Sequence, residues 1–145
     1  MKNIKILLAC LTVIFTGAAC GLLEDQTPEF ISFRMNGMAG SQVTVLYSKQ
    51  FVAGVDEEGI TRVEIFGADT VFHTLPIDTI IDVRLERRLY IQAEPAPADT
   101  LAVDVRVDVD ERNIFDRIGD LFPTVPWRFL YQFNTPFTDA IEVVI

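Results

Sequence analysis

The chain has 145 residues, half of them hydrophobic, and its 21 acidic side chains against 12 basic ones give a formal net charge of −9 at pH 7. This length fits one domain, and the negative charge argues against nucleic acid as a partner and against a basic membrane-binding patch. The two cysteines, Cys10 and Cys20, both lie near the N-terminus. We therefore expect no disulfide in the remainder of the chain, whose stability must come from core packing.

The first 20 residues follow the order of an export signal. Lys2 and Lys5 precede an almost wholly apolar run over residues 6–15. That run is too short for a membrane-spanning helix, which needs ~20 apolar residues. Three small residues follow and lead to Cys20, as expected where a signal segment is cleaved.

This segment resembles the signal peptide of bacterial lipoproteins. Ala18 and Ala19 match the two small residues that precede the acylated cysteine in that family, whereas Gly17 stands where an aliphatic residue is usual. The resemblance implies cleavage before Cys20 and its acylation, with palmitate among the acyl chains, so that lipid anchors the protein to a membrane. Residues 7–10 match the same motif but have little apolar chain upstream. An ordinary secretory signal or an uncleaved anchor would share several of these features.

The resemblance also divides the chain and implies a location. Residues 1–19 form the expected signal peptide, residues 20–29 the lipidated cysteine with a tether, and residues 30–145 a folded domain. The expected location is the bacterial cell envelope, with the domain anchored at the outer membrane and facing the periplasm or the medium. Glu24 and Asp25 weakly resemble a signal for the outer face, although a solvated linker has the same composition.

From residue 30 onward the hydrophobic pattern has a period of two, as in half-buried strands. Strands are predicted at residues 31–35, 43–47, 61–65, 81–93, 101–109, 127–133 and 141–145. Arg87 interrupts the apolar phase and indicates a bulge, a bend or a tight turn between two strands. Residues 113–122 have a helical period, with Asn113 as a cap and Pro123 as a stop, and predict one short helix.

Short strands at intervals of ~8–12 residues are typical of all-β folds with two packed sheets. We therefore predict an antiparallel β-sandwich, immunoglobulin-like, with one short helical crossing at residues 113–122. A small β-barrel is the alternative.

Few residues offer a catalytic or metal-binding pattern. His73, the only histidine, shares a phase with Val71 and Leu75, which predicts a structural role at the core or at an edge. A zinc site or a catalytic triad usually needs histidine with partners, and a single histidine with no unlipidated cysteine argues against transition-metal chemistry. Residues 108–113 place carboxylates at alternate positions, as calcium ligands require, but without the glycine and terminal glutamate of an EF-hand loop.

The other acidic residues fit a solvated sheet face better than a hydrolase site. Asp104, Asp108 and Asp110 share one predicted strand face, and charge balance with Arg84, Arg88 and Arg106 accounts for them. A glycosidase needs two carboxylates in one cleft, and the spacing alone does not bring any two together.

A run of aromatic residues lies near the C-terminus. Trp127, Phe129, Tyr131 and Phe133 share one strand phase, which predicts the buried face of a sheet rather than a groove for a sugar or a peptide. Tyr90 lies in a polar phase and is expected to be exposed.

These patterns predict a membrane-anchored lipoprotein whose β-sandwich is a non-enzymatic binding or assembly module at the cell envelope. Cys20, the lipidation site, is the only site residue assigned; no catalytic, cofactor-binding or metal-binding residue is predicted. The expected partners are the membrane, through the acyl chains, and an envelope protein or glycan. The alternative is a carboxylate-dependent hydrolase acting on envelope or extracellular glycans.

Overall fold

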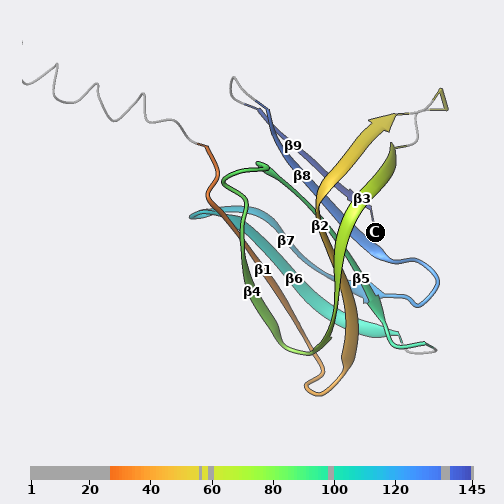
Figure 1. Cartoon of the computed structure of the whole chain (residues 1–145). Helices are drawn as coiled ribbons and strands as arrows, with labels where there is room; N and C mark the ends of the chain where they lie inside the picture. The colour runs from red at the N-terminus through yellow and green to blue at the C-terminus, as the bar shows by residue number, and fades with distance from the viewer. Residues whose placement is uncertain (1–26, 56, 59–60, 98–99, 135–137, 145) are drawn as a thin grey trace, which may run out of the picture.

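The computed structural model describes residues 27–144 except 56, 59–60, 98–99 and 135–137 (Figure 1). Cys20, the predicted signal peptide and most of the predicted tether therefore lie outside the described residues. Among those described, no helical segment has the length and hydropathy needed to cross a bilayer.

All regular structure in the described part of the chain is β-strand. The strands are β1 (Phe30–Gly37), β2 (Gln42–Val55), β3 (Thr61–Thr74), β4 (Ile77–Asp82), β5 (Arg88–Pro95), β6 (Leu101–Val109), β7 (Arg112–Leu121), β8 (Trp127–Asn134) and β9 (Thr138–Val144). They form two antiparallel sheets, one of four strands in the order β4-β1-β6-β7 and one of five in the order β3-β2-β5-β8-β9. We call these sheet A and sheet B.

The predicted β-sandwich is confirmed: the two sheets pack face to face and do not close into a barrel (Figure 1). The likeness to immunoglobulin domains is limited to this two-layer architecture. The four-stranded sheet of an immunoglobulin domain contains two pairs of consecutive strands. In sheet A only β6 and β7 are both consecutive and adjacent.

The predicted helix at residues 113–122 is wrong, because this segment is strand β7. It pairs with β6, and a tight turn in which Asp110 has a φ of 52° joins the two strands. Ile118, expected on the buried side of a helix, lies opposite Asp104 and is 83% exposed. The backbone hydrogen bonds of an adjacent hairpin outweigh a weak helical pattern here.

Alternation along the strands produces the core between the sheets. Sheet A contributes Ile31, Phe33, Met35, Val103, Val105, Val107 and Val109, and sheet B contributes Val43, Val45, Leu89, Ile91, Ala93, Trp127, Phe129 and Tyr131. The Phe33 ring stacks on Trp127 with centroids 5.9 Å apart, which joins the two sheets at the centre. The predicted burial of the aromatic run is thus confirmed for Trp127, Phe129 and Tyr131, while Phe133 is half-buried.

A second, smaller cluster comprises Phe51, Tyr90 and Leu130. Beyond Ser48, β2 no longer pairs with β5 and continues with β3 alone as a two-stranded arm (Figure 1). Phe51 on this arm packs on Tyr90 with ring centroids 6.2 Å apart. The predicted exposure of Tyr90 is therefore wrong: the arm covers it, and only 3% of Tyr90 is exposed.

Candidate binding cleft

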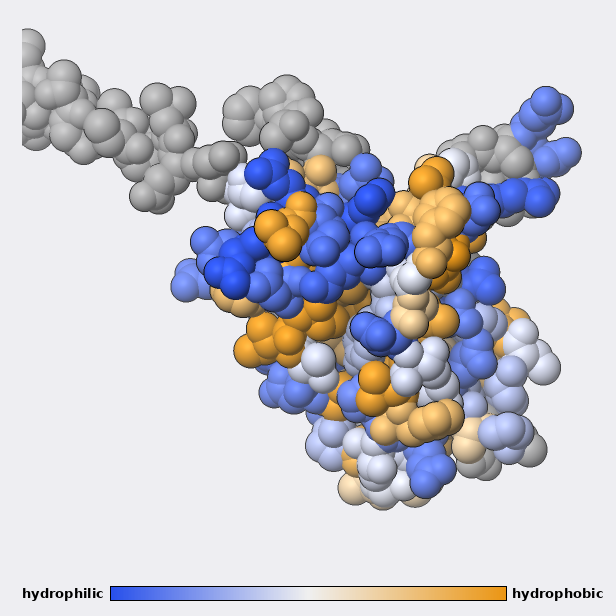
Figure 2. Space-filling model, viewed as in Figure 1, coloured by the Kyte–Doolittle hydropathy of each residue, from blue (hydrophilic) through white to orange (hydrophobic). Residues whose placement is uncertain are grey.

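A cleft of ≈ 590 Å³ lies at the edge of the sandwich where β3 of sheet B and β4 of sheet A flank an opening. Its lining comes from both strands, from β2, from β5 and from the turn before β5: Tyr47, Ser48, Lys49, Gln50, Gly67, Ala68, Asp69, Val71, His73, Thr79, Ile81, Glu86 and Leu89. Figure 2 views the molecule from this side and shows hydrophobic residues among polar ones over β3 and β4. The connection through Leu75 and Pro76 joins the two strands at one end of the opening.

Tyr47 and His73 form a polar pair in the wall of the cleft. They are hydrogen-bonded, with 3.2 Å between the Tyr47 hydroxyl and His73 Nε2. Their rings pack edge to face. Burial lowers the pKa of His73, so its imidazole is neutral at pH 7. Burial also raises the pKa of Tyr47, against a smaller opposing effect of its hydrogen bond with Thr79. The pair is therefore uncharged at neutral pH.

His73 lies on the edge strand β3 and is half-buried, which agrees with the edge position predicted from the sequence. Its partner Tyr47 was assigned only to a strand. What brings the two together is the pairing of Val43 with His73 and of Tyr47 with Asp69 across β2 and β3.

Two register shifts between β2 and β3 shape the wall of the cleft that these two strands form. Tyr47 pairs with Asp69, Gln50 with Gly67 and Phe51 with Ile65, so each strand in turn carries an extra residue. Ser48 stabilises the irregular segment: its hydroxyl donates to the Gly67 carbonyl and accepts from the Gln50 amide. Bulges re-aim side chains and are frequent beside binding sites.

The re-aimed chain places Lys49 across from the turn that follows β4. Lys49 Nζ lies 3.9 Å from a carboxylate oxygen of Glu86, and about one-third of each side chain is exposed. This ion pair joins the β2–β3 arm to the β4–β5 turn at the rim of the cleft. The same turn contains Arg87 with a φ of 53°, which identifies the predicted interruption at Arg87 as a tight turn.

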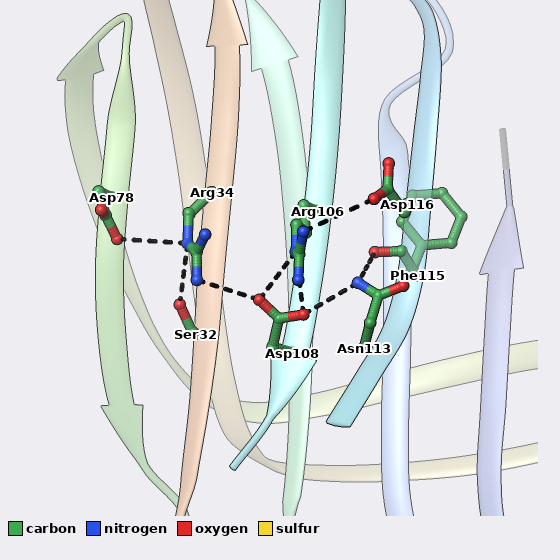
Figure 3. Close-up of polar contacts among 8 residues, drawn as sticks. All are labelled: Ser32, Arg34, Asp78, Arg106, Asp108, Asn113, Phe115 and Asp116. Atoms are coloured by element: carbon green, nitrogen blue, oxygen red, sulfur yellow. Dashed lines mark hydrogen bonds and ion pairs between the residues drawn. The ribbon is translucent and has the colours of Figure 1, made fainter. Parts of the chain in front are cut away.

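Of the acidic residues predicted on one strand face, Asp108 is the one at the centre of a polar network on the outer face of sheet A (Figure 3). Asp108 is only 5% exposed and accepts hydrogen bonds from Arg34 on β1 at 3.1 Å, Arg106 on β6 at 3.0 Å and Asn113 on β7 at 2.9 Å. Burial alone raises the pKa of Asp108, but the hydrogen bonds from Asn113 and Arg106 and the charges of both arginines outweigh it. The pKa of this carboxyl therefore lies below its usual range.

The residues considered for calcium do not converge on a site. Asp110, two positions further on, accepts the backbone amides of Glu29 and Phe30 and holds the start of β1 against the β6–β7 turn. Across the described ranges, no group of three or more histidine, cysteine or acidic residues is arranged to hold a metal ion. The predicted charge balance on this face includes Arg106, as expected. Arg88 instead donates to the Phe51 carbonyl on the other sheet.

The sequence interpretation missed most of the cleft residues. Ser48, Lys49, Gln50 and Glu86 come from a bulge and a turn, and their placement depends on pairings between distant segments. The only local signal was the loss of alternation after Tyr47.

The cleft combines paired polar groups with an apolar lining. Its polar groups are largely occupied by one another, as in the Tyr47–His73 and Lys49–Glu86 pairs, while Val71, Ile81 and Leu89 supply apolar lining. Clefts with apolar walls and a few placed polar groups are typical ligand sites.

Comparison with protein-family models found no match to this chain, and comparison with curated proteins found no similar sequence either.

Proposed function

We propose that this protein is an exported, lipid-anchored binding module of the bacterial cell envelope, without enzymatic activity, that holds its partner in the cleft between β3 and β4. The observation that carries the proposal is the open edge of the sandwich. There a ≈ 590 Å³ cleft lies between two edge strands, and exposed hydrophobic side chains flank it. Exposed apolar groups beside a cleft are characteristic of interaction sites.

The N-terminal segment supports the anchoring part of the proposal. Its resemblance to a lipoprotein signal implies acylation of Cys20, which is seven residues before Thr27, where the described chain begins. Two or more acyl chains hold a protein stably at a membrane. The proposed location is the outer membrane, with an envelope protein or glycan as the partner of the tethered domain.

Mass spectrometry of the N-terminal peptide from membrane-extracted protein tests the anchor. The expected peptide begins at Cys20 and is heavier than its sequence by the acyl groups. Cys20→Ser should release the protein from the membrane fraction, while Cys10→Ser should leave it there. An unmodified N-terminus, or an intact Met1, would refute the lipid anchor.

Photo-crosslinking in intact cells tests the cleft. A photoreactive amino acid at Val71, which lines the cleft, should form adducts with an envelope component. The matched control position is Ile118, an exposed residue on the edge strand at the opposite side of sheet A. Identical adducts from both positions would show that contact is indiscriminate and would exclude the cleft as the binding site.

A carboxylate-dependent hydrolase is the competing function, and one observation favours it. Asp69 and Glu86 both line the cleft, although Glu86 is already paired with Lys49. A glycosidase needs one carboxyl group as acid and a second as base or nucleophile. Hydrolysis of chromogenic glycosides by the purified protein, abolished by both Asp69→Asn and Glu86→Gln, would establish the enzyme and refute the binding module.

A further inference from the structure

The second half of β3 is an exposed strand edge, which we call the open edge and define as residues 68–74. Across the described residues, β3 pairs with β2 alone. Natural proteins usually blunt such edges with lysine, proline, extra charges or a short strand. β4 is short and begins directly after Pro76, and β7 carries Asp116, Arg117 and Asp120, whereas the open edge has Asp69 as its single charged side chain at neutral pH.

The open edge has regular geometry. From Asp69 to Thr74 its pairing with β2 is continuous, and the register shifts lie before it. Alternate backbone N–H and C=O groups of an edge strand point away from its neighbour and remain available to another strand. This stretch therefore offers hydrogen-bonding groups at the regular spacing of an extended polypeptide.

Side chains of the open edge alternate between two environments. Asp69, Val71 and His73 line the cleft. Phe72 has the opposite strand phase and is 84% exposed. A strand added beside β3 would direct every second side chain into the cleft and would set the others beside Phe72. Main-chain pairing then provides affinity, and the cleft selects side chains.

The negative charge of the protein indicates which kind of polypeptide could bind at the open edge. The protein carries a formal charge of −9, and Asp69 and Glu86 line the cleft against one cation, Lys49, which is paired with Glu86 and leaves Asp69 as the unbalanced charge. A second copy would bring the same negative charge to this edge, so like-charge repulsion disfavours self-association. A cationic segment is the complementary occupant.

We propose that the open edge binds an extended, basic segment of another envelope polypeptide, which adds to sheet B as a further strand beside β3. Its alternate apolar side chains enter the cleft, and a lysine or arginine lies near Asp69. This inference rests on the proposed function, because it assigns the partner of the same cleft.

Selection from a random heptapeptide display library tests the proposal, with the mature full-length protein in detergent as the target. We expect enriched peptides with alternating apolar residues and at least one lysine or arginine. A synthetic enriched peptide should shift the backbone amide NMR signals of residues 68–74. N-methylation of its alternate residues should weaken binding by about tenfold or more, because lost main-chain hydrogen bonds are not replaced.

Two charge variants locate the binding edge. Val71→Lys introduces a charge on the side of β3 that faces the cleft and should weaken peptide binding by about tenfold or more. Ile118→Lys introduces the same charge on β7 and should leave binding unchanged. If Val71→Lys lowers the Tm by more than about 5 °C, Phe72→Lys, which alters an exposed side chain of the same edge, replaces it.

The outcomes separate this inference from the proposed function. If N-methylated and unmodified peptides bind equally but Val71→Lys weakens both, the cleft binds ligands without strand addition, and only the inference is overturned. Adducts at Val71 that prove to be glycan, or a dimer of the wild type that Val71→Lys dissociates, overturn the inference in the same way. If no library peptide is enriched on the wild type over Val71→Lys and no adduct forms at Val71, both fail.

Discussion

At the residue scale, Asp108 shows how a buried carboxylate is retained in a sheet. Three donors from three strands surround it, and two of them are arginines whose side chains remain almost half exposed. Breaking a buried ion pair costs most when the remaining charge stays buried. Here both arginines can turn toward water. The network therefore links β1, β6 and β7 but contributes only moderately to the free energy of unfolding.

Asp108→Asn should lower the free energy of unfolding by about 1–2 kcal/mol, because the charged acceptor is lost while the buried volume is preserved. Urea denaturation of the purified domain measures this change. The matched control is Asp116→Asn, whose side chain is exposed and lies 4.0 Å from Arg106. That variant should stay within about 0.5 kcal/mol of the wild type, and equal losses in both variants would contradict the central role of Asp108.

The same residue predicts a pH dependence of stability. Because the pKa of Asp108 is depressed in the folded state, its contribution is fully present above the ordinary value of 3.8 and is lost as the pH falls through the folded pKa. The unfolding free energy of the wild type should therefore fall more steeply below pH 3.8 than that of Asp108→Asn. Parallel curves for the two proteins across the acidic range would rule out this linkage.

At the element scale, the β2–β3 arm depends on one small cluster outside the main core. Phe51 is buried against Tyr90, and the Arg88 guanidinium lies 5.6 Å from the centre of the Phe51 ring. Arg88 also donates to the Phe51 carbonyl at 3.0 Å. The arm also carries Lys49 and Gln50, so it contributes to the lining of the cleft.

Phe51→Ala should release the arm while leaving the sandwich folded. We expect hydrogen exchange at arm amides to accelerate by a factor equivalent to about 2 kcal/mol or more, because a buried Phe→Ala change costs ~3–5 kcal/mol and local detachment limits the loss. Amides of β5 and β6 should keep their protection. Val52→Ala is the control, since Val52 neighbours Phe51 in β2 and is 58% exposed. Uniform acceleration across all strands would mean that the arm is not a separate unit.

The elements also show why part of the fold was readable from the sequence. β6 alternates without interruption because Leu101 and its valines face the core while its polar side chains lie on the opposite face of sheet A, so its sequence pattern predicts a strand directly. β7 is an edge strand whose Phe115 is half-buried and whose Ile118 is exposed, so no alternation is imposed and a helical period arises by accident. Tyr90 was misassigned because the arm that covers it comes from a distant segment.

The cleft was less predictable than the fold for the same reason. The phase of His73 indicated an edge, but the position of that edge opposite β4 follows from the order of strands in both sheets. Lys49 and Glu86 meet only because the bulge turns β2 at Ser48. Local patterns encode burial well and encode long-range pairing poorly.

At the scale of the whole molecule, the sandwich should unfold as one cooperative unit. Phe33 from sheet A stacks between the sheets on Trp127, the single tryptophan. Fluorescence of Trp127 and far-UV circular dichroism should therefore report the same denaturation midpoint. Phe33→Leu should lower the unfolding free energy by about 1–2 kcal/mol and move both midpoints together. Midpoints that separate would show that the sheets unfold independently.

The order of strands in sheet A also has a consequence in time. β1 is the first strand of the domain to be synthesised, yet its two neighbours are β4 and β6, and Met35 pairs with Val105. At roughly 5–20 residues per second, the ribosome reaches Val105 about 4–14 s after Met35. During that interval the edge of β1 that pairs with β6 is open, so sheet A is completed only late in synthesis, after β2 to β5 have been made.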